Sequence, residues 1–356
     1  MFLLSKVLLT CLLSGSRALH LPLRKDVELA LAPIVVSGLL QEATSTVHVT
    51  QAVASAEVVS GLLQEATSTV HVTQTVASAE VVSSAAASSV ASASATALPY
   101  TGSAGITYSP YQKNGQCKTE SMVQSDLAQL HSFGIIRIYD TDCEVLGNVV
   151  SALTGSQKIM IGIWNIQKIQ DSVDAISAAF SSDFSKIYAV SIGNELVNSG
   201  QASVSEIQSA VSTARDLLGG IGFTGQIVTV DTLVAVSANP ALCECSDFIA
   251  VNCHPYWDGN VEPSDCGTWL QQQIASLQTK CGTAKQVLIT ETGWPNFGSP
   301  NGKCNPSASN MQTCINAISS SVGSQAILFS TYNDYWKPPG PYNVEQRWGI
   351  FGDPAF

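Results

Sequence analysis

The chain has 356 residues, of which 45% are hydrophobic and only 12% are charged, and its formal net charge is −11. This length allows one large domain with an appendage or two ordinary domains, and the hydrophobic content is sufficient for a buried core. The negative charge argues against nucleic acid and against an anionic membrane surface as partners, because both are negatively charged themselves. A neutral ligand such as a glycan is compatible with this charge, although charge alone does not select it.

Residues 1–18 are predicted to form a secretory signal peptide. Lys6 precedes the apolar run Val7–Leu13, which is too short to span a bilayer. Ser16 and Ala18 have the small-x-small spacing that a signal peptidase accepts, so we expect cleavage after Ala18. A buried N-terminal helix is the alternative. No second long apolar run and no lipid-anchor signal follow, so we expect a secreted protein without a membrane anchor.

Residues 19–104 are predicted to be a disordered, low-complexity spacer. Residues 35–57 and 58–80 form a tandem repeat with a period of 23, and the copies differ only where Ala52 becomes Thr75. Two copies are too few for a solenoid, and the Ser/Ala-rich run that follows cannot bury enough surface to offset the entropy of ordering. The spacer either holds a domain away from a surface, carrying O-linked glycans, or is a tolerated duplication without a role.

From Gly105 onward, short β-rich runs alternate with helical patterns. The predicted strands are Gly105–Tyr111, Ile135–Asp140, Lys158–Trp164, Tyr188–Glu195, Gln226–Thr232, Phe248–Tyr256, Gln286–Thr292 and Ala326–Tyr332. The predicted helices include Glu120–Phe133, Asp171–Phe180, Ser203–Leu218, Thr268–Thr279 and Ser307–Ser321. Eight such units over residues 105–356 predict an α/β fold, the (β/α)8 TIM barrel. A doubly wound open sheet is the alternative, but the Gly-x-Gly-x-x-Gly turn that should follow its first strand is absent.

Two glutamates stand at the ends of predicted strands, where a barrel places its catalytic side chains. Glu195 ends the fourth strand and Glu291 ends the seventh. Glycoside hydrolysis needs one protonated carboxyl to assist the leaving oxygen and one ionised carboxylate to attack the sugar or activate water. Asn194, beside Glu195, is predicted to hydrogen-bond the sugar 2-hydroxyl. The alternative for either glutamate is a structural ion pair.

The sequences around both glutamates resemble the signatures of family-17 glycoside hydrolases, which are retaining β-1,3-glucanases with a (β/α)8 barrel. The segments that carry the resemblance are Ile192-Gly193-Asn194-Glu195, Thr290-Glu291-Thr292-Gly293-Trp294-Pro295, Gly105–Tyr111, Arg137–Cys143, Val251–Tyr256, Phe329–Lys337 and Val344–Phe351. They cover roughly residues 105–356 and are most similar to the fungal soluble cell-wall glucanases, some of which behave as transglycosylases.

The resemblance implies specific roles at the site. Glu195 becomes the general acid/base and Glu291 the nucleophile, with carboxyl groups about 5–5.5 Å apart. Asp334, Lys337 and Glu345 match polar positions around the nucleophile. A lysine beside carboxylates favours their charged forms.

Aromatic residues complete the predicted substrate site. Tyr108 and Tyr256 are predicted to steady the sugar or Glu291, with core packing as the equal alternative. Trp294, together with Trp257 and Trp336, is predicted to stack on sugar rings, with barrel capping as the alternative. Trp164 is a weaker candidate for the same role.

Ten cysteines agree with an oxidising destination, and loss of Cys11 with the signal peptide leaves an odd number. Cys117 and Cys143 follow adjacent strands, and they match a pair in the fungal relatives. Cys266 and Cys281 flank a helix about 22 Å long, too far for a disulfide between them. A second group of cysteines lies near His254 in the sequence, namely Cys243, Cys245 and Cys253. For this group we favour structural disulfides over a zinc site, because no paired CxxC spacing occurs. The pairing of Cys304 and Cys314 stays open.

The sequence therefore predicts a secreted, monomeric hydrolase that acts on β-1,3-glucan, is retained in or near the cell wall, and needs no cofactor or metal. Three alternatives stay open. They are a β-1,3-glucan transglycosylase, a non-catalytic glucan-binding wall protein, and an enzyme of the same architecture that acts on another β-glycan.

Overall fold

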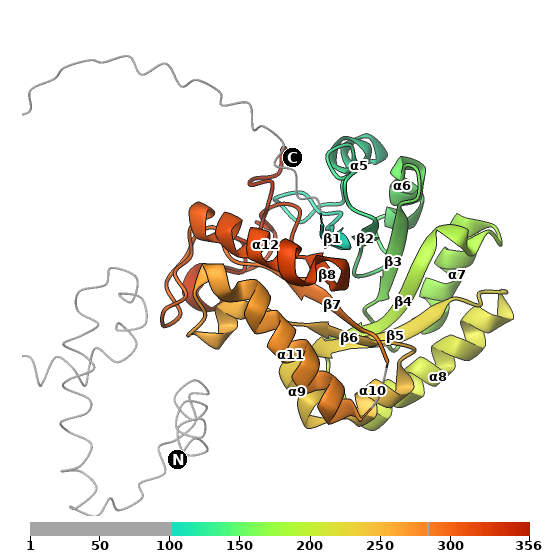
Figure 1. The fold of residues 1–356 in the computed structure, drawn as a ribbon. Coiled ribbons are helices and arrows are strands. Elements are labelled where there is room, and N and C mark those ends of the chain that lie inside the picture. Colours follow the sequence, from blue (N-terminus) through green and yellow to red (C-terminus); the bar gives the residue numbers. More distant parts are fainter. Residues whose placement is uncertain (1–101, 283–284) are drawn as a thin grey trace, which may run out of the picture. The chain divides into compact units, whose positions relative to one another are not determined.

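The computed structural model describes residues 102–282 and 285–356. The predicted signal peptide (1–18) and the predicted spacer (19–104), apart from its last three residues, lie outside the described residues. The described residues form a closed (β/α)8 barrel (Figure 1). This confirms the predicted fold class and excludes the open doubly wound sheet.

The barrel consists of eight parallel strands that pair in sequence order, with β8 closing onto β1. The strands are β1 (Gly105–Thr107), β2 (Ile135–Arg137), β3 (Lys158–Ile163), β4 (Ile187–Asn194), β5 (Gln226–Thr232), β6 (Ile249–Asn252), β7 (Val287–Thr292) and β8 (Ala326–Leu328). Several are shorter at the carboxyl end than the sequence predicts. The residues that follow them form loops, and these loops build the site described below.

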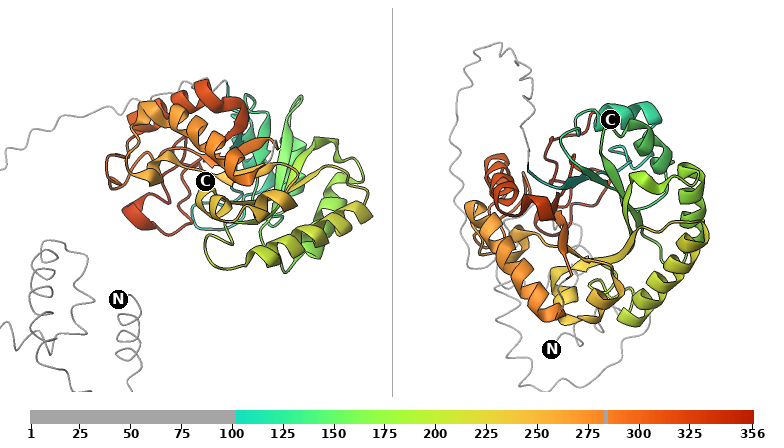
Figure 2. Two further views of the ribbon diagram at one scale, coloured as in Figure 1. Left: turned by 60° about the horizontal axis from the view of Figure 1, so that its bottom comes forward. Right: turned by 45° about the vertical axis from the view of Figure 1, so that its right-hand side comes forward.

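Helices alternate with the strands and surround the barrel (Figure 2). They are α5 (Glu120–Leu127), α6 (Val145–Ala152), α7 (Ile169–Phe180), α8 (Val204–Gly220), α9 (Leu233–Ala238), α10 (Ala241–Cys245), α11 (Cys266–Cys281) and α12 (Ala308–Val322). The long helices α7, α8, α11 and α12 agree with prediction within two residues at each end. Their capping chemistry is local: Ser203 begins α8 with a capping box to Glu206, and Ser307 caps α12. The short helices α6, α9 and α10 were not predicted.

Successive side chains of each strand point to opposite sides of the barrel wall. One cluster of buried residues comes from strand positions such as Ile135, Val228, Val230 and Leu288 and contains no helix residue, so it fills the barrel interior. A larger cluster joins the outer faces of the strands to the helices. On β2, the alternation that places Ile135 inside also places Arg137 inside, nearer the carboxyl end.

Three disulfides join the described residues. Cys117–Cys143 confirms the predicted pair, while Cys266 pairs with Cys314 and Cys243 with Cys281. The disulfide of Cys243 removes it as a zinc ligand, and within residues 102–282 and 285–356 no cluster of three potential metal ligands occurs. Cys245, Cys253 and Cys304 are free thiols.

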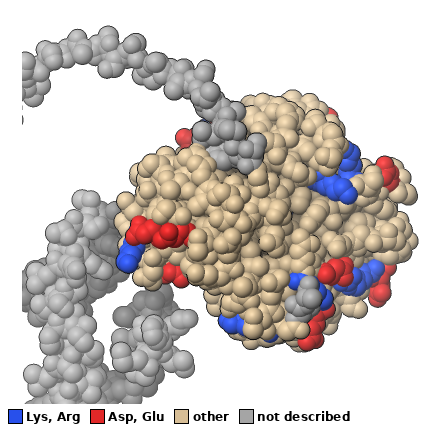
Figure 3. Space-filling view, in the orientation of Figure 1, with Lys and Arg blue, Asp and Glu red and all other residues tan. Residues whose placement is uncertain are grey.

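Charged side chains are sparse on the face shown in Figure 3, and its basic side chains form no continuous patch. No helix within the described part of the chain has the length and apolar character needed to cross a membrane.

A buried ion pair fixes the loop after β1 to α5. Lys118 Nζ lies 2.8 Å from Asp126 Oδ2, and both side chains are almost fully buried. Asp126 Oδ2 also accepts a hydrogen bond of 2.9 Å from the Tyr108 hydroxyl. Lys118 Nζ donates a further hydrogen bond to the carbonyl of Ser109. The pair therefore orders the start of the loop that leads to Cys117.

We predict that Asp126→Ala lowers the free energy of unfolding by about 3–5 kcal/mol, because it leaves the Lys118 ammonium buried without its counter-charge. Chemical denaturation monitored by circular dichroism measures the change. Glu120→Ala, at an exposed position of the same helix, is the control and should cost less than about 1 kcal/mol. Equal losses in the two variants would contradict a stabilising role for the buried pair.

Candidate active site

A cavity of about 890 Å³ opens at the carboxyl ends of the strands. Both predicted catalytic glutamates line it, together with Asn194, Asn252 and His254. The loops after the strands supply the rest of the wall. This is the end of a (β/α)8 barrel at which active sites are built.

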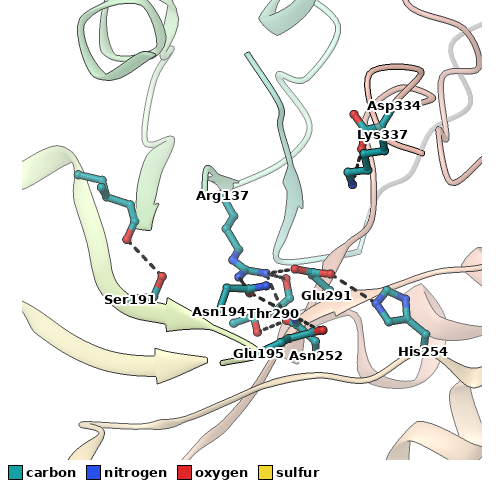
Figure 4. A network of polar contacts seen from close by, with 11 residues as sticks. Arg137, Ser191, Asn194, Glu195, Asn252, His254, Thr290, Glu291, Asp334 and Lys337 are labelled. Carbon is teal, nitrogen blue, oxygen red and sulfur yellow. Dashed lines mark hydrogen bonds and ion pairs between the residues drawn. The ribbon is translucent and has the colours of Figure 1, made fainter. Parts of the chain in front are cut away.

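Glu291 lies within β7 and is almost fully buried. Its Oε1 atom is 2.8 Å from Nη1 of Arg137, which reaches it from β2 across the barrel interior (Figure 4). Its Oε2 atom lies 3.5 Å from Nε2 of His254. The His254 ring itself packs edge-to-face against Phe329 and Trp348, at centroid distances of 5.3 and 4.8 Å. Both oxygens of Glu291 therefore face groups that fix the orientation of the carboxylate.

Asn252 connects the two glutamates through side-chain hydrogen bonds. Its Nδ2 atom donates to Glu195 Oε1 at 2.8 Å, and its Oδ1 atom accepts from Arg137 Nη1 at 3.3 Å. Arg137 also donates from Nη2 to Asn194 Oδ1 at 2.8 Å. One network consequently runs from Glu195 through Asn252 and Arg137 to Glu291 (Figure 4).

Glu195 directly follows β4 and adopts a left-handed backbone conformation with φ of 56°. Non-glycine residues rarely adopt this conformation because the Cβ atom crowds the backbone. Burial, with a smaller repulsive contribution from the charge of Glu291, raises the pKa of the Glu195 carboxyl. Glu195 is thereby favoured in its protonated form.

The pKa of Glu291 moves in the opposite direction. Burial alone would raise it, but the positive charge of Arg137 and the contact with His254 lower the pKa of Glu291 to about 2. Glu291 is therefore ionised at any pH at which the protein would ordinarily work. One carboxyl with a raised pKa and one with a lowered pKa, in the same cavity, suit the acid and the nucleophile that glycosidic bond cleavage requires.

Three other predicted site residues also line the cavity, namely Asn194, Lys337 and Glu345. Asp334 does not line it but forms an ion pair with Lys337, with Nζ and Oδ2 2.9 Å apart. Burial would lower the pKa of the Lys337 ammonium, but the charges of Asp334, Glu291 and Glu345 raise it. Lys337 therefore keeps its positive charge beside the cavity.

Three aromatic residues predicted to contact substrate lie elsewhere. Tyr108, Tyr256 and Trp294 are almost fully buried and do not line the cavity. The Tyr108 hydroxyl donates to Asp126, the Tyr256 hydroxyl to the carbonyl of Ser299, and the Trp294 indole N–H to the carbonyl of Asn305. The structure thus gives Tyr108 and Tyr256 the core-packing role that was their alternative, and it buries Trp294 instead of exposing its ring to a ligand.

Other tryptophans do line the cavity. Trp164, Trp257 and Trp336 are between 37% and 43% exposed, which leaves ring surface accessible to a ligand. Trp336 is also packed against Tyr111, with ring centroids 4.7 Å apart. Flat aromatic surfaces of this kind suit the apolar faces of pyranose rings.

Sequence reasoning missed Arg137, Asn252 and His254 as site residues, although all three lie in segments that carry the family resemblance. The alternation along β2 puts Arg137 on the same face as Ile135, two positions earlier, but it does not say which face that is. Both faces of a parallel barrel strand are buried, so the apolar pattern did not show which face was the interior.

The closed (β/α)8 barrel carries two glutamates at the carboxyl ends of its strands, Glu195 with a raised pKa and Glu291 with a lowered pKa. This is the architecture and the site of a glycoside hydrolase. Residues 105–349 match the family described as the BtgE/BtgC glycoside hydrolase domain, and the chain belongs to this family.

Two fungal proteins are closely similar to this chain in sequence. The chain is 48% identical over 254 residues to "Cell surface mannoprotein MP65" of Candida albicans, covering 71% of this chain and 67% of the relative. It is also 48% identical over 251 residues to "Probable family 17 glucosidase SCW10" of Saccharomyces cerevisiae, covering 70% of this chain and 64% of the relative. This confirms the resemblance to family 17. The chain spans about two thirds of the length of these relatives.

A solved structure shares the fold. It is the family 17 β-1,3-glucanosyltransferase from Rhizomucor miehei, with a TM-score of 0.59 and 20% sequence identity, covering 70% of this chain and 93% of that chain. At this identity the similarity establishes the barrel fold.

We predict that Arg137→Met moves the acidic limb of the pH profile of kcat/KM upward by about one to three pH units. Removing the guanidinium raises the pKa of Glu291, so a smaller fraction of Glu291 is ionised at low pH. Initial rates measured from about pH 2 to about pH 7 would show the shift, because the limb of the unsubstituted protein lies near the Glu291 pKa of about 2.

Arg215→Met is the matched control, because Arg215 pairs with Asp247 at a half-exposed position and does not line the cavity. Its acidic limb should stay in place. An unshifted limb in a folded Arg137→Met protein would show that Arg137 does not set the ionisation of Glu291.

Proposed function

We propose that this glycoside hydrolase is a retaining enzyme that cleaves β-1,3-glucan at the cell surface. The observation that carries the proposal is the joint placement of Glu195 and Glu291 in one cavity with opposite pKa shifts. The substrate is supported by the family-17 resemblance and by the name of the Rhizomucor protein of the same fold, a β-1,3-glucanosyltransferase. The location is supported by the name of the Candida relative and by the predicted signal peptide.

In the first chemical step, a Glu291 carboxylate oxygen attacks the anomeric carbon and the bond from that carbon to the glycosidic oxygen breaks. Glu195 donates its proton to the departing oxygen, so the leaving saccharide is neutral and a covalent glycosyl ester remains on Glu291. Oε2 is the better placed attacking atom, because Oε1 is engaged by Arg137 at 2.8 Å.

In the second step, ionised Glu195 removes a proton from an incoming hydroxyl group, and the resulting oxygen attacks the anomeric carbon and releases Glu291. Water as the incoming group gives hydrolysis, whereas a sugar hydroxyl gives a longer glucan. Arg137 stabilises the Glu291 carboxylate again as it leaves, because the ion pair re-forms when the ester breaks. The two activities therefore share every residue of the first step.

We predict that Glu291→Gln lowers kcat/KM on a β-1,3-glucan oligosaccharide by at least about 10⁴-fold, because the neutral amide cannot form the glycosyl ester. Chromatography of the products over time measures the loss. Glu262→Gln, an exposed position near the loops of the site, is the control and should leave the rate unchanged.

The products of the unsubstituted chain distinguish the related functions. Shorter saccharides alone identify a hydrolase, and products longer than the input identify a transglycosylase. Binding of the oligosaccharide without any turnover would refute an enzymatic role and support a wall-binding protein, while turnover of another β-glycan alone would refute the substrate assignment.

We also predict that kcat/KM on the oligosaccharide falls as the pH rises through the raised pKa of Glu195, because ionised Glu195 has no proton to donate. The hydrogen bond from Asn252 lowers this pKa, so Asn252→Ala should move the alkaline limb to higher pH. A pH series on both proteins measures the limb. Movement to lower pH would contradict the assignment of Glu195 as the acid.

A further inference from the structure

The segment that carries Glu195 is held by β5 rather than by its own strand alone. β4 and β5 are parallel neighbours (Figure 1). Their register shifts between Ile192 and Asn194. Beyond this shift, the amide of Glu195 donates to the carbonyl of Val230 at 3.0 Å. The chain then turns through residues 196–200 before α8 begins.

Asp231, the next residue of β5, receives the amides of that turn. Its Oδ2 atom accepts from the Val197 amide at 2.9 Å, and its Oδ1 atom accepts from the Asn198 amide at 3.2 Å. Oδ1 also accepts from the amide of Thr232 at 2.8 Å. Asp231 is 2% exposed, and it does not line the cavity. Three backbone donors thus converge on one buried carboxylate.

This placement matters because Glu195 has an uncommon backbone conformation. A left-handed φ on a non-glycine residue costs of order 1–3 kcal/mol and persists only when surrounding contacts impose it. The amides of residues 197 and 198 are the first donors after Glu195 that are fixed by a group outside the turn. Hydrogen bonds from amides to a carboxylate are stronger than those between neutral groups.

We propose that Asp231 is a positioning residue for the general acid, holding the turn after Glu195 so that the Glu195 carboxyl meets the glycosidic oxygen. This inference rests on the proposed glycosidase function. It assigns Asp231 no contact with the substrate. Its effect on the reaction passes through Glu195 and concerns proton transfer. It fixes the turn after Glu195, and its negative charge makes a small contribution to the raised pKa of Glu195. Glu291, by contrast, is held by Arg137 of β2 and by His254, which follows β6.

The test uses two substrates that differ in their need for an acid. A β-1,3-glucan oligosaccharide has a sugar alkoxide as leaving group and requires protonation, whereas 2,4-dinitrophenyl β-laminaribioside releases a stable phenolate without it. The Asp231→Asn variant keeps the shape of the side chain. However, it replaces one acceptor oxygen with an NH2 group that faces a backbone N–H, so one bond of the turn is lost.

In the full chain, we expect Asp231→Asn to lower kcat/KM on the oligosaccharide by at least about tenfold and on the dinitrophenyl glycoside by less than about threefold. The kcat/KM ratio reports the step that cleaves the glycosidic bond, which makes the comparison specific for the acid. Thr229→Val is the matched control, because Thr229 is buried on the same strand and its hydroxyl donates to the carbonyl of Ile192 at 2.9 Å. Its effect on the two substrates should be equal.

Equal losses on both substrates in a folded Asp231→Asn protein would overturn the proposal, since they would indicate a general structural role. If Asp231→Asn does not fold, Asp231→Ser, which keeps one hydroxyl acceptor, answers the same question. Failure of the proposed function is distinguishable, because the unsubstituted chain would then turn over neither substrate.

Discussion

The buried ion pair between Arg137 and Glu291 is the interaction on which the site depends. Removing both charges from water is costly, and the cost is offset here by a contact of 2.8 Å and by further hydrogen bonds from Arg137 to Asn194, Asn252 and the carbonyl of Thr290. Arg137 occupies the layer of the barrel interior just beyond the apolar residues. A buried guanidinium orders the polar side chains around it, because its N–H groups need hydrogen-bond acceptors that water cannot supply there.

The two carboxyls owe their different proton affinities to their neighbours rather than to their residue type. Glu291 is the more deeply placed, yet it is ionised because a cation lies beside it. Glu195 meets no cation at such a distance within the described residues, so burial and the charge of Glu291 dominate its pKa. Ionised Glu291 consequently disfavours a second negative charge nearby and helps to keep the pKa of Glu195 raised.

The backbone supports the same division of roles. Glu291 lies inside a regular strand, whereas Glu195 lies just past one, in a conformation that β5 stabilises through Val230 and Asp231. The side chain of a residue outside the hydrogen-bonded strand is not bound to the alternating directions of the strand residues before it. The barrel thus presents one carboxyl from within its sheet and the other from a supported turn.

The sequence by itself determined the fold class, the long helices and the position of Glu195 and Glu291 at the ends of strands. Periodic apolar runs, Ser-based helix caps and strand-end motifs are local features, so they can be read from the sequence. It also favoured the Cys117–Cys143 pair, whose members follow adjacent strands. Only the tertiary structure decided that Arg137, Asn252 and His254 face the cavity and that Tyr108, Tyr256 and Trp294 do not. The physical reason is that both faces of each barrel strand are buried, so apolar patterning cannot distinguish the interior from the helix layer, and closure of the barrel fixes which side chains meet.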